Sequence, residues 1–197
     1  MTYFIDQSGK IEDTAKDTVL AAVNENDTAV ILSAKDKRRL QENFRILGKP
    51  QLFVDAVFAA VLHFLVKKLT RRGRICVDIE YPGHTKIIEK IVNQLADKDV
   101  GLEWVLVGKS SRAHDVAYKV FKKKLKMGKK LTAVEIWNQA NKIAGGRLNA
   151  GLSPANRRSA PAANQTIAEL RRKSRRKRSS FDGRELSLDR KVLSHGQ

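Results

Sequence analysis

Residues 75–80 read Ile-Cys-Val-Asp-Ile-Glu, and the rest of the predicted fold is arranged around this stretch. Successive side chains of a β-strand point to opposite faces, so the pattern gives one apolar face and one face with two carboxylates. The apolar face holds Ile75, Val77 and Ile79, and the other holds Cys76, Asp78 and Glu80. Pro82-Gly83 follows directly and ends the segment. The stretch therefore predicts a short strand with acidic residues at its carboxyl end.

Three apolar segments before it predict an antiparallel meander. They are residues 2–6, 18–23 and 28–32. Residues 24–27, Asn-Glu-Asn-Asp, join the second and third segments and contain the Asn and Asp that favour turns, so these two should form a hairpin. Residues 52–69 then carry apolar residues over too great a length for a strand and predict a mostly buried helix.

A second half alternates strands and helices. Residues 85–96 place apolar residues at helical spacing, residues 102–107 predict a fifth strand, and residues 113–125 predict a further helix. The order of three strands, helix, strand, helix, strand and helix combines an antiparallel part with two crossover units that favour parallel pairing. We therefore predict an α/β domain over residues 1–125 with a mixed five-stranded sheet.

The composition changes after this domain. Thr132-Ala-Val-Glu135 has the spacing of a helix capping box and predicts a short helix to about Ala144, which Gly145-Gly146 stops, within an appended helical segment over residues 126–150. Residues 151–197 combine a stretch with two prolines and a strongly basic run, and contain few apolar residues. We expect this extension to be a basic, largely disordered tail.

Charge indicates a polyanionic partner. The 197-residue chain has a formal net charge of +18, and the basic residues are concentrated in the second part. Residues 1–118 contain 18 Lys and Arg against 16 Asp and Glu, whereas residues 119–197 contain 21 against 5. Such a density neutralises phosphates and favours nucleic acid. The predicted nucleic-acid contacts are Arg171, Arg172, Lys173, Arg175, Arg176, Lys177 and Arg178, with Lys122, Lys123 and Lys124 as further candidates.

Several features predict a cytoplasmic protein that associates with nucleic acid and not with membranes. The single cysteine, Cys76, lies in an apolar run and cannot form an intramolecular disulfide. The N-terminus lacks the pattern of a secretory signal. The longest apolar run is interrupted by Asp55 and His63, and falls short of the roughly 18 uncharged residues that a membrane span needs.

Three carboxylates occupy positions where an apolar element has no structural need for them. Asp6 closes the first strand, Glu80 closes the fourth, and Asp115 opens the helix at residues 113–125. A buried carboxylate is costly unless it meets hydrogen bonds, a cation or solvent. Carboxylates that hold two divalent metals can hydrolyse phosphodiester bonds, and Mg²⁺, with Mn²⁺ as substitute, suits oxygen ligands. Alternatively, Asp6 serves the following turn and Asp115 compensates the helix dipole.

The order of these elements and motifs resembles the ribonuclease H-like nuclease superfamily, and is most similar to Holliday-junction resolvases of the RuvC type. The resemblance rests on Ile-Asp ending the first strand, Ile-Glu ending the fourth and His-Asp opening the last core helix, and it covers residues 1–125. It implies that the first and fourth strands are neighbours at the centre of the sheet. It also implies that Asp6 bridges two metals, Glu80 holds one and Asp115 completes the other.

The chain departs from that family at the last helix. RuvC-type enzymes place a second aspartate one turn after the first, whereas Tyr118 and Lys119 follow Asp115 here. Either Asp78, which shares a face with Glu80, takes over this duty, or His114 serves as a ligand or proton carrier. Asp55 resembles the helix carboxylate of the ribonuclease H branch, although we interpret it as compensating the dipole of its helix.

Two functions follow from these observations. The first is a Mg²⁺-dependent endonuclease with a two-metal mechanism that cuts structured nucleic acid, either branched DNA or an RNA/DNA-type duplex, with DNA favoured over RNA. Resolvases of this resemblance commonly act as dimers, so a homodimer is expected with it. The second is a non-catalytic nucleic-acid-binding protein on the same fold. A weaker alternative is an accessory protein that recruits a partner through the basic tail.

Overall fold

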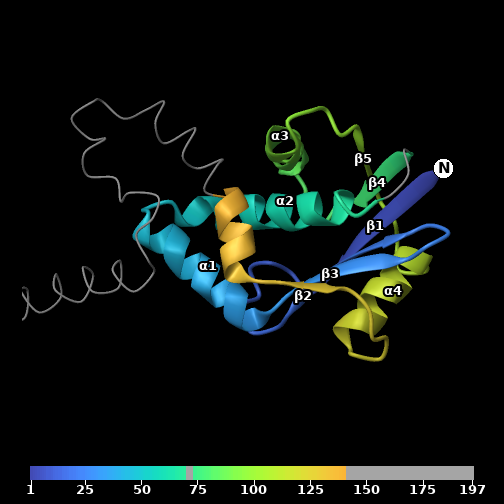
Figure 1. Ribbon diagram of the computed structural model, residues 1–197, viewed down its shortest axis with the longest axis horizontal. Coiled ribbons are helices and arrows are strands. Elements are labelled where there is room, and N and C mark those ends of the chain that lie inside the picture. The colour runs from blue at the N-terminus through green and yellow to red at the C-terminus, as the bar shows by residue number, and fades with distance from the viewer. Residues whose placement is uncertain (70–72, 141–197) are drawn as a thin grey trace, which may run out of the picture. The chain divides into compact units, whose positions relative to one another are not determined.

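The computed structural model describes residues 1–69 and 73–140 (Figure 1). The predicted tail at 151–197, with its basic run at 171–178, lies outside the described residues, as does the end of the predicted appended segment.

A mixed sheet with strand order β5-β4-β1-β2-β3-β6 forms the centre of the described part. The strands are β1 (Thr2–Ser8), β2 (Thr18–Val23), β3 (Thr28–Leu32), β4 (Arg74–Asp78), β5 (Leu102–Val105) and β6 (Lys129–Leu131). Strands β1, β2 and β3 pair antiparallel, while β4 is parallel to both β1 and β5. The predicted hairpin and the expected pairing of the first and fourth strands are both confirmed.

The predicted number of five strands is wrong, because β6 pairs in parallel with β3 at the edge of the sheet. Strand β6 consists of Lys129, Lys130 and Leu131, of which only Leu131 is buried. Three residues are too few to show an alternating pattern, so the sequence carries no local signal for this strand. Residues 133–140, which follow it, are helical as predicted.

A helix that the sequence did not predict, α1 (Ala34–Ile46), lies between β3 and the long apolar helix. The Ser33 side chain caps it by accepting a hydrogen bond from the Asp36 backbone N–H. Its sequence is mostly charged, and it buries only Lys37, Leu40, Asn43 and Phe44. Phe44 packs edge-on against Trp137 with ring centroids 5.4 Å apart, which makes Trp137 a packing residue.

The remaining helices follow the sequence prediction closely. They are η1 (Pro50–Leu52), α2 (Phe53–Val66), α3 (Thr85–Ala96) and α4 (Arg112–Phe121). Helix α4 ends four residues earlier than predicted, because Lys123 takes a left-handed conformation with φ of 59°. Among the described residues, none of the helices is long and apolar enough to span a membrane.

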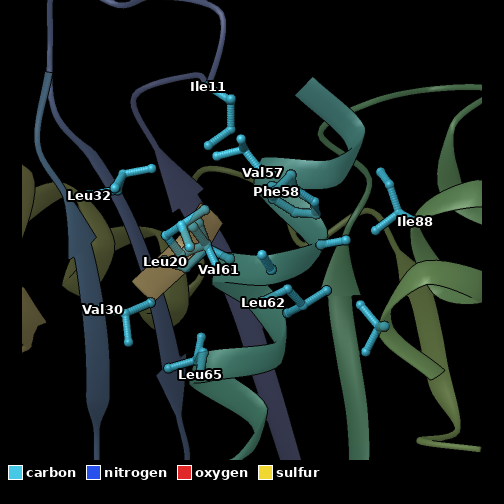
Figure 2. Close-up of a cluster of buried hydrophobic side chains, with 14 of the residues drawn as sticks. Ile11, Leu20, Val30, Leu32, Val57, Phe58, Val61, Leu62, Leu65 and Ile88 are labelled. Carbon is cyan, nitrogen blue, oxygen red and sulfur yellow. The ribbon is translucent and has the colours of Figure 1, made fainter. Parts of the chain in front are cut away.

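Helices cover both faces of the sheet. Helices α2 and α3 lie on one side and α4 lies on the other (Figure 1). Figure 2 shows the core on the α2 side, where Leu20, Val30 and Leu32 of the sheet face Val57, Val61 and Leu65 of α2. The other core packs Val19, Ala21, Val23 and Ala29 against α4. Because Ile5 and Val77 point into the α2 side, Asp6 and Asp78 point toward the α4 side.

Candidate metal centre

Three carboxylates converge where the pairing of β1 with β4 ends; β1 itself continues to Ser8, so the predicted end of the first strand at Asp6 is wrong. Asp6 lies on β1, Asp78 is the last residue of β4, and Glu80 follows two residues later. One oxygen from each lies within 4.8 Å of the others. The convergence follows from the parallel pairing of Ile5 with Val77, which brings the next residues of both strands to the same edge. The predicted meeting of Asp6 with Glu80 is thus present in the structure, and Asp78 joins them.

Burial and the charges of neighbouring carboxylates raise the pKa values of Asp6 and Glu80. Asp6 is 4% exposed, and burial raises its pKa to about 6, with the charge of Asp78 adding to the shift and His114 opposing it. Burial likewise raises the pKa of Glu80 to about 7, reinforced by the charges of Asp6 and Asp78. Lys10 opposes this second shift. Negative groups therefore outweigh the positive groups around these carboxylates. This excess of negative charge would stabilise a bound cation.

Asp78 is held in place by the strand next to it. The backbone N–H of Val107 donates a 2.7 Å hydrogen bond to Asp78 Oδ1, and the Ile79 N–H donates to the carbonyl of Val105. These bonds fix the end of β4 against the segment that follows β5. Asp78, which the sequence left as an alternative ligand, is consequently a rigid member of the cluster.

His114, and not Asp115, occupies the position on α4 beside the cluster. Nδ1 of His114 lies 3.0 Å from Oδ2 of Asp6. Asp115 is instead exposed and forms a 2.7 Å ion pair with Lys119, with both side chains about half exposed. Ser111 caps α4 by accepting a hydrogen bond from the His114 N–H, and this start of the helix turns His114 toward β1. Within the described residues, Asp115 is not part of the three-acid cluster.

Asp55 also lies apart from the cluster. It is buried in the first turn of α2, where its Oδ1 lies 2.8 Å from Nδ1 of His84. The pair joins the start of α2 to the residue preceding α3. Asp55 therefore has a structural partner of its own.

Tyr81, which was not predicted as a site residue, forms hydrogen bonds to residues close to the cluster in sequence. Its hydroxyl accepts hydrogen bonds from Gln7 Nε2 and the Ile11 N–H, and donates to Glu12 Oε2 at 3.1 Å. Gln7 follows Asp6 and Tyr81 follows Glu80. The hydrogen bond between Gln7 and Tyr81 therefore joins the two segments that carry these carboxylates. The only sequence signal is an aromatic residue next to Glu80, which does not reveal a partner about 70 positions away.

Replacing Tyr81 with Phe should destabilise the protein by about 1–3 kcal/mol, because the Gln7 and Ile11 donors lose their acceptor inside a partly buried network. Urea unfolding monitored by circular dichroism measures this loss. Tyr118→Phe is the matched control, since Tyr118 is exposed on α4 and should change stability by less than about 0.5 kcal/mol. Equal effects of the two substitutions would show that the Tyr81 hydroxyl has no supporting role.

Lys37 of α1 fixes the loop between β1 and β2. Its ammonium donates 2.7 Å hydrogen bonds to the carbonyls of Lys10 and Asp13 and a 2.8 Å bond to Thr18 Oγ1. The side chain is fully buried, and this burial lowers the pKa of Lys37 to about 8. The same loop supplies Ile11 and Glu12 to Tyr81, so Lys37 and Tyr81 both hold this loop in place.

The predicted basic residues after α4 are exposed. Lys122, Lys123 and Lys124 follow the last turn of the helix, and Lys122 Nζ lies over the rings of Tyr118 and Phe121. The predicted contacts between Arg171 and Arg178 lie outside the described residues.

The raised pKa values predict that acid stabilises the metal-free fold. In the folded state the pKa values of Asp6 and Glu80 are about 6 and 7, whereas their ordinary pKa values are 3.8 and 4.5. The folded state therefore binds more protons between these limits, and the stability from this pair is full below about pH 4 and lost by about pH 7.

Urea unfolding in EDTA at about pH 5 and pH 7.5 tests this sign against the double variant Asp6→Asn/Glu80→Gln. Wild type should lose more stability than the variant on going to the higher pH. Adding Mg²⁺ at the higher pH should restore it in wild type alone. Parallel pH dependence of both proteins would contradict the prediction.

Comparison of the chain with protein-family models, curated proteins and solved structures found no match. The described part of the chain is an α/β fold with a mixed six-stranded sheet, and three carboxylates converge where the pairing of its central parallel strands β1 and β4 ends.

Proposed function

We propose that the protein is a Mg²⁺-dependent endonuclease that hydrolyses phosphodiester bonds in structured nucleic acid. The observation that carries the proposal is the convergence of Asp6, Asp78 and Glu80 within 4.8 Å where the pairing of β1 with β4 ends. The order β5-β4-β1-β2-β3, with the first three strands antiparallel and the other two parallel to β1, supports a ribonuclease H-like fold. The edge strand β6 is an addition to that arrangement.

The donor set fits a hard divalent cation. All three side chains offer carboxylate oxygens, which Mg²⁺ and Mn²⁺ prefer, and the raised pKa values of Asp6 and Glu80 favour a cation beside them. When bound, such a cation polarises the phosphoryl group and lowers the pKa of water. In the two-metal form of the proposal, Asp6 would serve as a ligand to both cations. His114, which contacts Asp6, would take the place of Asp115 as the further ligand.

His114 also suits proton transfer. When Asp6 is ionised, the Nδ1–H of neutral His114 donates a hydrogen bond to the Asp6 carboxylate, and this leaves Nε2 as the acceptor nitrogen. The Asp6 carboxylate thereby sets both the orientation and the tautomer of the ring. The side chain is about one third exposed, so a reacting group can approach it.

Charge supports nucleic acid, with DNA favoured, as the substrate. The net charge of +18 attracts a polyanion, and the exposed lysines at 122–124 follow the helix that carries His114. Branched DNA and an RNA/DNA-type duplex are the substrates that the resemblance to resolvases and ribonucleases H favours. The basic run at 171–178 adds binding that is indifferent to sequence.

End-labelled four-way DNA junctions, RNA/DNA duplexes and linear DNA test the proposal. The full chain should cut at least one of the first two with Mg²⁺ or Mn²⁺ and none with EDTA. Binding to these substrates without cutting under any metal would replace the proposal with its alternative, a nucleic-acid-binding protein without catalysis.

A further inference from the structure

An exposed stripe of three residues on α4 leads away from the metal centre. His114, Tyr118 and Lys122 follow each other at intervals of four and so lie on one side of the helix. His114 contacts Asp6 at one end, and Lys122 caps the other end. We call these three residues the α4 stripe, which extends about 12 Å along the helix axis.

Each side chain of the α4 stripe is aligned with the next: the two rings are nearly parallel, and the ammonium group lies over the Tyr118 ring. The rings of His114 and Tyr118 are stacked, with centroids 6.3 Å apart and planes 11° from parallel. Lys122 Nζ lies 5.6 Å from the centroid of the Tyr118 ring. Tyr118 is nevertheless 44% exposed, so its side chain reaches solvent between these two neighbours. An open aromatic ring beside an ammonium group presents a surface for stacking next to a site for an anion.

The segment that follows α4 is strongly basic, and of its lysines Lys129 is paired with Glu135 at 2.8 Å. Residues 116–134 contain no Asp or Glu, and six exposed lysines follow α4: Lys122, Lys123, Lys124, Lys126, Lys129 and Lys130. A protein partner of ordinary composition would need a larger apolar contact than one tyrosine. Alternating base faces and phosphates instead match an aromatic ring flanked by lysines.

We propose that the α4 stripe binds a single-stranded segment of DNA, with a base stacked on Tyr118 and neighbouring phosphates on Lys122 and the lysines after it. The proposal rests on the function proposed above and narrows it, because the preferred substrate then carries unpaired nucleotides beside the bond that is cut. In a continuous duplex the bases are stacked on each other and cannot reach the ring.

Binding of the full chain to a single-stranded oligodeoxynucleotide containing 2-aminopurine tests the stacking. EDTA is present throughout, so that no cleavage is needed. Tyr118→Ala should weaken binding about 5- to 150-fold and abolish the fluorescence change of the stacked base, while Tyr118→Phe should stay within about twofold of wild type. A blunt duplex of the same sequence should be bound equally by all three proteins.

Salt dependence tests the lysine of the stripe. Lys122→Ala should lower the slope of log affinity against log salt by about 0.7, the contribution of one contact to single-stranded nucleic acid. Lys90→Ala removes an exposed lysine from α3, on the other side of the sheet, and should leave the slope unchanged.

Single-strand binding by Tyr118→Ala that equals wild type would overturn the proposal, and so would an equal loss on the blunt duplex. These outcomes are separate from the nuclease test. If the wild-type protein cuts DNA and the Tyr118→Ala variant binds single strands normally, only the proposal for the α4 stripe is refuted. A stripe that binds in a protein that never cuts refutes only the nuclease.

Discussion

Replacing Asp6 with Asn is expected to lower metal-dependent cleavage by more than about 100-fold. Loss of a side chain that merely orients a metal ligand already costs about 10- to 100-fold, and Asp6 is the most buried of the three converging carboxylates. Binding of the oligonucleotide should change little, because Asp6 lies beneath the surface. Initial cleavage rates and binding in EDTA, measured on the same preparations, separate the two effects.

Asp115→Asn is the control for this prediction, because it removes a carboxylate one residue from His114 without touching the cluster. Its exposed pair with Lys119 contributes at most about 1 kcal/mol, so cleavage should remain within about threefold of wild type. An Asp115→Asn variant as inactive as Asp6→Asn would restore the ligand set that the family resemblance implied. Full activity of Asp6→Asn would remove Asp6 from the mechanism.

Replacing Lys37 with Met should destabilise the protein by about 2–4 kcal/mol. Methionine fills much of the same volume, but the carbonyls of Lys10 and Asp13 and the hydroxyl of Thr18 lose their buried donor. The relief from burying a charge offsets only part of this loss. Urea unfolding in the presence of EDTA measures the change without a contribution from bound metal.

Lys35→Met on the same helix is the matched control. Lys35 is exposed, and its replacement should change stability by less than about 0.5 kcal/mol. If the two variants unfold at the same urea concentration, Lys37 does not hold the loop between β1 and β2.

The elements that local pattern predicts are those with a continuous apolar face. Helix α3 runs from Thr85 to Ala96 in both the prediction and the structure, because its apolar residues recur at helical spacing. Helix α1 was missed because one of its few buried side chains is a lysine, whose partners lie in a loop about 20 residues earlier. Long-range hydrogen bonding of this kind leaves no periodic signal in the sequence.

The cluster of three carboxylates was predicted in part, because local alternation reveals some of its members and helix rotation decides the rest. Alternation along residues 75–80 places Asp78 and Glu80 on one face, and the parallel pairing of β1 with β4 brings Asp6 to them. The residue that α4 contributes depends on the rotation of that helix against the sheet. The cap at Ser111 and the packing of Val116 set this rotation and present His114 to Asp6, whereas the sequence motif favoured Asp115.

Binding of Mn²⁺, followed by electron paramagnetic resonance, tests most directly whether Asp6, Asp78 and Glu80 form a metal site. The full chain should show a saturable site from which Mg²⁺ displaces Mn²⁺. Asp6→Asn and Glu80→Gln should each lose this site, and Asp115→Asn should keep it. Binding that does not saturate, or that is the same in all four proteins, would contradict the assignment of this cluster as a metal centre.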